Sequence, residues 1–297
     1  MRPTSIIFLV VSVLLIIAGL ITIGVANQLA VSEGIVLIEK ADTDSSVFTY
    51  DYSQDGIAKL IINVRDADIN IIGGSAKPYI ELVNFFEGTY EFSSINRILT
   101  VKDSSDLSTA EGIGSFITGF KGLRGIVNQY NSRGLEKTVN VYISAAYPVN
   151  VTDCSVESGD VSISSIGYAA DYLVDIGTGN LSLVSVETTS KVRAEIDEGD
   201  VSMDNCRIAD FTAELKYGGV DANAKLYKVD ADIEHGDFVY YTKEQLGVTG
   251  FAMTCTSGSI SINGENFGGY RVEENASTEN ILDITVGKGN IIVTSRE

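Results

Sequence analysis

The chain has no tryptophan, one histidine, three cysteines and three prolines among its 297 residues. With His235 as the only histidine and no Cys-x-x-Cys pair, the ligand sets of structural zinc sites are excluded. A serine nucleophile would have only His235 to activate it, and no Gly-x-Ser-x-Gly elbow is present. These absences argue against nucleophilic catalysis.

Basic residues are also scarce. The chain carries 21 Lys and Arg against 40 Asp and Glu, a formal net charge of −19. A surface with this excess of negative charge repels nucleic acid and anionic lipid headgroups, so neither is expected as a partner. Without tryptophan the best sugar-stacking platform is missing, although tyrosines are available as substitutes. They are Tyr168, Tyr172, Tyr217, Tyr240 and Tyr241.

Glycine, in contrast, is abundant and regularly placed. Between residues 151 and 293 the phrase apolar-polar-apolar, glycine, small polar residue, apolar-polar-apolar occurs seven times, with glycine spacings of 20, 20, 19, 18, 22 and 31 residues. Spacings in this range are typical of the coils of a solenoid. The glycines are Gly159, Gly179, Gly199, Gly218, Gly236, Gly258 and Gly289.

Alignment on the glycines places apolar residues at matching offsets in every repeat. Three positions before the glycine stand residues such as Val156, Ile176 and Ile196, and two positions after it stand Val161, Leu181 and Val201. Period-2 alternation on both sides of a turn predicts two strands with one buried face each. A coil this short has no room for a helical crossover, so successive coils are expected to stack in parallel. A sandwich of antiparallel hairpins would not predict identical apolar columns.

The sequence therefore predicts an all-β chain: a parallel β-helix, or solenoid, with coils of about 20 residues. The glycine should mark each corner, where a residue without Cβ adopts positive φ freely. An earlier coil is expected around Ala67, since residues 60–71 repeat the apolar columns. Cys154 and Cys255 fall in inward columns, which favours buried free thiols over a disulfide.

The first residues form the one long apolar run of the chain. Residues 6–26 would span about 31 Å as a helix, close to the hydrocarbon thickness of a bilayer. We expect an uncleaved single-pass anchor at 1–28, an acidic linker at 29–45 and a β-helix ectodomain at 46–297. Cleavage at Val25-Ala26 or Leu29-Ala30 is the alternative. Arg2 precedes the run and acidic residues follow it, so the ectodomain should lie outside the cell membrane.

One segment breaks the strand rhythm. Between 111 and 130 the apolar residues fall at helical spacing, from Ile113 and Phe116 to Tyr130. Five glycines weaken this helix, so it needs a surface to form. We expect a short helical insert that covers an end or flank of the β-helix. Membrane contact, docking of a partner helix and a disordered glycine-rich loop remain alternatives.

Carboxylates recur on the outward face. Four positions before the glycine, consecutive coils carry Asp175, Glu195, Glu214 and Asp232. Neighbouring carboxylates about 4.8 Å apart in water repel by roughly 0.9 kcal/mol, so a solvated acidic stripe needs no ligand. A line of oxygen ligands for Ca²⁺ or Mg²⁺ is the alternative. No cofactor is otherwise expected.

The order of motifs resembles a known family. An apolar N-terminal run, the phrase Ala67-Asp68-Ile69-Asn70-Ile71, a strand leading to Tyr147-Pro148 and repeated Ser-Gly-Asp-Val-Ser-Ile phrases are similar to the bacterial putative adhesin family of β-strand-repeat proteins. The resemblance covers most of residues 55–297. It implies a right-handed, single-stranded β-helix at the cell envelope, and it brings no catalytic residues.

Three functions follow from these observations. The first is a non-enzymatic, membrane-anchored envelope protein that binds a surface polymer or protein through the flank of the solenoid. The second is a polysaccharide-active β-helix enzyme that uses grouped carboxylates, with Arg193 beside Asp175 and Glu195 as the suggestive neighbours. The third is a sensor of envelope stress for another membrane protein.

Overall fold

The computed structural model describes residues 47–85, 90–103, 135–243, 250–268, 270–275 and 280–295. Within these ranges β-strands are the only regular secondary structure, as the repeat pattern predicts. A search of the same ranges finds no helix with the length and apolarity needed to cross a membrane. The predicted anchor at 1–28, the linker at 29–45 and the helical insert at 111–130 lie outside the described residues.

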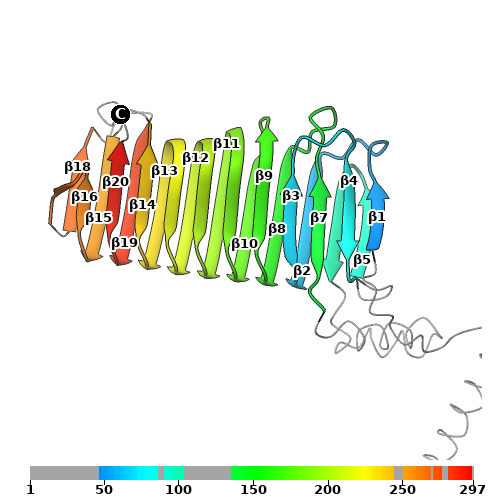
Figure 1. Ribbon diagram of the computed structural model, residues 1–297, viewed down its shortest axis with the longest axis horizontal. Coiled ribbons are helices and arrows are strands. Elements are labelled where there is room, and N and C mark those ends of the chain that lie inside the picture. Colours follow the sequence, from blue (N-terminus) through cyan, green and yellow to red (C-terminus); the bar gives the residue numbers. More distant parts are fainter. Residues whose placement is uncertain are drawn as a thin grey trace, which may run out of the picture.

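The repeats stack as parallel coils in register. Leu181 pairs with Val161 on one side and with Val201 on the other, and Ile176 pairs with Ile196. Figure 1 shows the result, a rod whose strands run across its long axis. The parallel β-helix-like solenoid is thus confirmed, and its right-handed sense stays a prediction.

Two faces of the rod carry the strands on either side of the glycine corner. We name them the pre-glycine face and the post-glycine face, and both extend through the long strands β11 (Leu181–Glu198), β12 (Val201–Tyr217) and β13 (Val220–His235), which turn from one face to the other. The pre-glycine face also contains β5 (Tyr90–Ile95), β6 (Ile98–Asp103), β2 (Lys59–Asp66), β8 (Val151–Ser158), β10 (Asp171–Thr178), β19 (Ile281–Lys288), β15 (Gly250–Ser257) and β18 (Tyr270–Glu274). The post-glycine face contains β1 (Val47–Asp51), β4 (Tyr79–Val83), β7 (Thr138–Tyr142), β3 (Asp68–Ile72), β9 (Val161–Gly167), β14 (Phe238–Thr242), β20 (Ile291–Ser295), β16 (Ile260–Ile262) and β17 (Glu265–Asn266).

The interior is filled by the apolar columns. Ile176 is completely buried and Ile196 is 3% exposed, so the offsets chosen from the sequence do point inward. All three cysteines are buried and free. The thiols behave as small core side chains.

The glycine corner is tight for two reasons. All seven repeat glycines have φ between +138° and +152°, a conformation that L side chains rarely adopt. In addition, a Cβ built on Gly199 would lie 1.7 Å from the carbonyl oxygen of Gly179 in the neighbouring coil. Glycine is therefore required by the close stacking of corners as well as by the backbone angle.

A side-chain ladder follows the glycines along the corner. The backbone N–H of Asn180 donates to Asp160 Oδ1 at 2.7 Å, and the N–H of Asp200 donates to Asn180 Oδ1 at 3.0 Å. The N–H of Gly219 in turn donates to Asp200 Oδ1 at 2.7 Å. The side chain of the Asp or Asn after the glycine thus accepts a hydrogen bond from a backbone N–H of the next coil, and not from the backbone of its own coil.

Replacement of Asn180 by Ala should lower the free energy of unfolding by about 1 kcal/mol, because the Asp200 N–H loses its acceptor. Urea unfolding followed by circular dichroism measures the change. Ser182→Ala, two residues further along the same coil, is the control and should unfold with wild-type stability. Equal stability of Asn180→Ala and wild type would show that the ladder contributes nothing.

The coils also turn at a second corner, which we call the side turn. Ser165, Ser185 and Asn205 occupy it with φ of 57°, 53° and 52°. The next coil has no counterpart of Asn205, since Asp204 pairs with Asn223 and Cys206 with Ala224. The loss of this residue accounts for one of the two steps by which the glycine spacing falls from 20 to 18.

The order of coils along the rod differs from their order in the sequence at both ends. The coil of Gly289 lies between those of Gly236 and Gly258, because β19 pairs with both β13 and β15, and β20 with both β14 and β16. Figure 1 shows the red β20 between β14 and β16. The expectation that every coil stacks on its sequence neighbour is wrong here, since β15 and β16 form the outer coil before the chain returns.

The other end repeats this arrangement. The predicted coil around Ala67 is present as β2 and β3, and it stacks directly on β8 and β9. Strands β6 and β7, which come later in the chain, lie outside it. Strand β6 therefore ends at Asp103, and β7 begins at Thr138, on the two sides of the position where other coils have their glycine corner.

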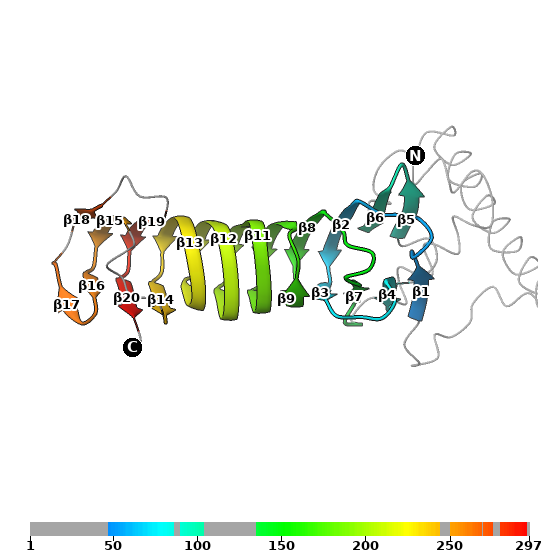
Figure 2. The same cartoon turned by 90° about the horizontal axis from the view of Figure 1, so that it is seen from above.

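Both ends are finished by antiparallel strands, visible from above in Figure 2. Strand β5 pairs with β6, and β4 and β1 extend β7, while β18 and β17 pair with β15 and β16. At the first end Phe48 packs on Tyr90 and Phe92, with ring centroids 5.9 and 5.5 Å apart. Short antiparallel strands and aromatic rings thus cover the outermost coils.

Candidate functional site

The predicted acidic stripe is a continuous row on the pre-glycine face. Asp175, Glu195, Glu214 and Asp232 occupy directly paired positions on four neighbouring strands. The row then continues into Thr285 and Thr254. The register brings the four carboxylates into one line, about 4.8 Å apart from strand to strand.

One basic side chain, Arg193, pairs with the two carboxylates in the middle of this row. The guanidinium of Arg193 contacts the carboxylate of Glu195 and lies 3.2 Å from that of Glu214. The sequence placed Arg193 beside Asp175 and Glu195. Its side chain instead leans toward the following coil and joins Glu195 to Glu214. A carboxylate pair held by one arginine is an ion-pair network, so Glu195 and Glu214 do not form a free acid and base across a sugar bond.

A second pair of carboxylates lies beside this row where β13 meets β19. Asp230 and Asp283 occupy paired positions on these strands, next to Asp232. Partial burial, followed by the charge of Asp230, raises the pKa of Asp283 above its usual range. Repulsion between the two carboxylates is therefore a local cost of the fold at neutral pH.

The raised pKa sets the sign of a pH effect. A carboxyl group whose pKa is higher in the folded protein favours folding below its ordinary pKa of about 3.9, and this contribution is lost as the pH rises through the folded value. Asp283→Asn should therefore raise the melting temperature at pH 7, with little difference from wild type near pH 3. Asp221→Asn on the post-glycine face is the control. A wild-type melting temperature for Asp283→Asn at pH 7 would contradict this assignment.

No metal centre emerges from the part of the chain that the structure describes. There, no group of three or more His, Cys, Asp or Glu side chains is arranged to hold a metal ion. The carboxylates of the row follow one another from strand to strand, which spreads their oxygens along the rod. Ca²⁺ or Mg²⁺ ligation by the row finds no support in this geometry.

The single histidine is stacked on a tyrosine, and the three cysteines are buried. The His235 ring stacks on Tyr217 in the neighbouring coil, with centroids 5.0 Å apart and planes 2° from parallel. Burial raises the pKa of the Cys154, Cys206 and Cys255 thiols. A thiol with a raised pKa is a poor nucleophile, because the thiolate is the reactive form.

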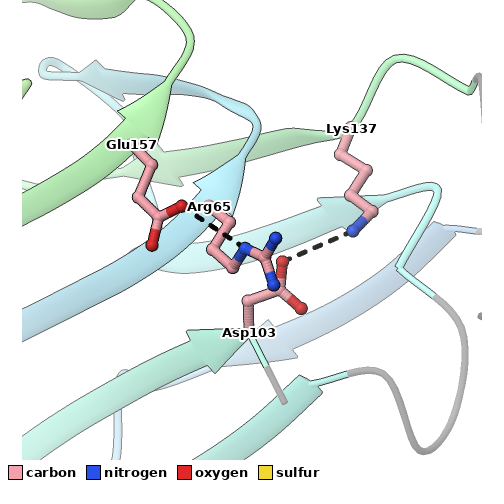
Figure 3. Close-up of polar contacts among 4 residues, drawn as sticks. All are labelled: Arg65, Asp103, Lys137 and Glu157. Carbon is pink, nitrogen blue, oxygen red and sulfur yellow. Dashed lines mark hydrogen bonds and ion pairs between the residues drawn. The ribbon is translucent and has the colours of Figure 1, made fainter. Parts of the chain in front are cut away.

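A small ionic cluster lies between the end of β6 and the start of β7 (Figure 3). Lys137 Nζ is 3.4 Å from Asp103 Oδ2, and their side chains are only 13% and 3% exposed. Lys137 also lies over the Phe85 ring, 5.5 Å from its centroid. Nearby, Arg65 pairs with Glu157 at 3.4 Å, and its guanidinium points toward Asp103. The buried pair Asp103–Lys137 thus joins the last residue of β6 to the residue that precedes β7.

A groove of about 650 Å³ lies along the side turn, where the coils become shorter. Its walls carry polar side chains from successive coils, including Glu187, Asp204, Arg207, Asn223 and Lys225. These residues do not stand out by type in the sequence. The signal that could have found them is the fall in glycine spacing, which marks the coil that lost a residue.

Comparison with known proteins fits this architecture. Residues 57–294 match the Toastrack DUF4097 family, so the chain belongs to that family. A solved structure of a putative adhesin from Bacteroides fragilis is similar, with 13% identity, a TM-score of 0.50, and coverage of 86% of this chain and 98% of that one. At this identity the likeness supports a shared fold only.

Two further solved structures show weaker likeness. A putative adhesin from Parabacteroides merdae has 11% identity and a TM-score of 0.44, covering 86% of this chain and 98% of that one. A putative cell adhesion protein from Clostridium sporogenes has 13% identity and a TM-score of 0.39, covering 85% and 100%. No curated protein matches the chain.

Proposed function

We propose that this protein is a non-enzymatic, membrane-anchored protein of the cell envelope that binds a surface polymer or protein through the flank of its rod. The observation that supports binding most is the in-register stacking of outward side chains over many coils. A row of this kind presents one repeated spacing over a long surface, which suits an extended partner.

The absence of assembled chemistry supports a binding role. In the described ranges His235 is stacked, the cysteines are buried and the central carboxylates are paired with Arg193. The polysaccharide-active alternative needs two free carboxyl groups placed across a glycosidic bond, and no observed pair stands out in that role. The sensor alternative concerns a second protein and has no structural observation in its favour.

Anchoring rests on the sequence. The apolar run at 6–26 and the acidic residues that follow it lead us to propose one membrane span, with the C-terminal ectodomain outside. Protease added to intact cells should digest a C-terminal epitope tag, while a tag at the N-terminus stays protected. Protection of the C-terminal tag, or its recovery with soluble proteins, would contradict this topology.

Binding is tested with envelope material. Full-length protein should sediment with purified cell-wall polymer or with intact envelope fragments, and pretreatment of the fragments with glycosidases or proteases should identify the partner's class. No reducing sugar or shortened chain should be released during the incubation. Failure to bind any envelope fraction would refute the proposed function, and release of cleaved product would favour the enzyme.

A further inference from the structure

The groove at the side turn is a structural consequence of coil shortening. Three coils place Ser165, Ser185 and Asn205 at this turn with positive φ, and the fourth passes it one residue shorter. Side chains of the longer coils, Ser185 and Asn205, and of the shorter coil, Ala224 and Lys225, line the same groove. The groove therefore runs along the rod and crosses from the longer coils to the shorter one.

Two rows of polar side chains border this groove. The first contains Asp204 and Asn223, which are paired in register, and the Asn223 amide donates to Asp204 Oδ1 at 2.7 Å. The second contains Glu187, Arg207 and Lys225, which are paired in the same way. The groove thus offers acceptors on Glu187 and Asp204 and donors on Arg207 and Lys225, spaced from coil to coil by about 4.8 Å.

The charged groups are held in place by their neighbours. Arg207 Nη2 donates to Tyr227 Oη at 2.6 Å, while Nη1 lies 3.8 Å from Glu187 Oε1. Lys225 Nζ lies over the Tyr227 ring, 5.3 Å from its centroid. A guanidinium has five N–H donors and a carboxylate about four acceptor positions, so these contacts leave capacity for a ligand. Ordered groups of this kind bind with a smaller loss of side-chain entropy.

The charge balance indicates the type of ligand. The groove is lined by three basic residues, Arg207, Lys225 and Lys243, and by two acidic ones, Glu187 and Asp204. The chain as a whole has a net charge of −19, which repels anionic polymers from the surroundings of the groove. Carboxylates and cations side by side suit hydroxyl groups, because each hydroxyl both donates and accepts.

We infer that the groove is a binding site for a neutral, linear oligosaccharide that lies along the rod. Asp204 and Asn223 bind hydroxyl groups on one side, and Arg207 and Lys225 on the other, with Glu187 and Tyr227 positioning the arginine. The volume of about 650 Å³ is in the usual range for sites of small ligands. This inference rests on the proposed function, since it names the class of polymer and the place where it binds.

Gly167 offers a direct way to block the site. It lines the groove, and a Cβ added there meets nothing within 4 Å. Gly167→Trp should therefore fill the groove without disturbing the fold. Thr212→Trp, on the pre-glycine face, adds the same bulk elsewhere. Arg207→Ala removes hydrogen bonds instead of space, and loss of one hydrogen bond from a charged group corresponds to about a tenfold change in Kd.

The experiment titrates full-length protein with chitotetraose, cellotetraose, xylotetraose and tetragalacturonate by calorimetry. At least one neutral oligosaccharide should bind wild type and Thr212→Trp equally, with about tenfold weaker binding to Arg207→Ala and loss of binding to Gly167→Trp. Circular dichroism verifies that each variant is folded. If Gly167→Trp is misfolded, the affinity of Arg207→Ala for the oligosaccharide tests the inference alone.

Four outcomes overturn the inference. They are no binding of any neutral oligosaccharide, preference for tetragalacturonate, equal binding by Gly167→Trp and wild type, and binding of an extended peptide in the groove instead. Sedimentation with envelope fragments separates this failure from that of the proposed function. If Gly167→Trp sediments like wild type, the rod still binds its partner and only the groove assignment fails.

Discussion

Gly199→Ala should destabilise the rod by about 4 kcal/mol or more, or prevent folding, although it adds a single methyl group. The added Cβ would lie 1.7 Å from the Gly179 carbonyl oxygen and 2.6 Å from its carbonyl carbon, both backbone atoms of the neighbouring coil. The backbone angle of +148° adds strain for any L side chain. Because no rotamer can relieve a clash with backbone, the corners must separate and lose their hydrogen bonds.

Gly167→Ala is the matched control, because the same methyl group meets nothing within 4 Å there. It should leave stability unchanged or raise it slightly, since alanine restricts the unfolded chain. Urea unfolding followed by circular dichroism suits a chain without tryptophan. A Gly199→Ala protein as stable as Gly167→Ala would contradict the close stacking of the corners.

Lys137→Met should lower the free energy of unfolding by about 3 kcal/mol, since it leaves the buried carboxylate of Asp103 without its lysine, and only the Arg65 guanidinium still points toward it. The Asp103 side chain is only 3% exposed, and its Oδ1 has no hydrogen-bond partner among the described residues. The double variant Lys137→Met/Asp103→Leu removes both charges, so we expect it to regain most of the loss. Thermal and urea unfolding of the two variants measure this recovery.

An exposed ion pair provides the comparison. Lys216 Nζ lies 2.6 Å from Asp197 Oδ1, closer than in the buried pair, but both side chains are more than half exposed. Lys216→Met should unfold with wild-type stability, because solvent screens such pairs. Equal free energies of unfolding for Lys137→Met and Lys216→Met would show that burial of the Asp103–Lys137 pair does not affect stability.

The columns of the rod were predictable because their pattern is local. Ile176 and Ile196 stand at the same offset from a glycine, and period-2 alternation fixes the face on which each lies. The same reasoning placed Asp175 and Glu195 in one outward row. Side-chain direction along the rod is not part of this pattern, which is why the contact of Arg193 with Glu214 could not be predicted.

The order of coils was not predictable from the same pattern. The coils of Gly258 and Gly289 carry equivalent apolar columns, so either one fits against the coil of Gly236. The repeat pattern shows that a residue belongs to an inward column of the rod, but it does not show which coils lie on either side of it. Spacings of 22 and 31 residues, which depart from the regular 18 to 20, were the available signal. The hairpin partners β17 and β18 account for much of the longer one.

The groove could not be found from residue types either. Asp204, Arg207 and Asn223 are ordinary outward residues of their strands, and only the loss of a residue at the side turn gathers them around one hollow. Such a step depends on the register between coils. The glycine spacing shows that a residue is missing, but it does not show which side chains meet as a result.

Disulfide formation between engineered cysteines tests the stacking order most directly. A disulfide requires Cα atoms about 4.4–6.8 Å apart, which allows one coil spacing and excludes two. Val239 pairs with Ile292, and Ile292 pairs with Ser261, so Val239 and Ser261 are two coils apart. The account predicts that Val239→Cys/Ile292→Cys becomes oxidised and that Val239→Cys/Ser261→Cys stays reduced; the reverse result would contradict it.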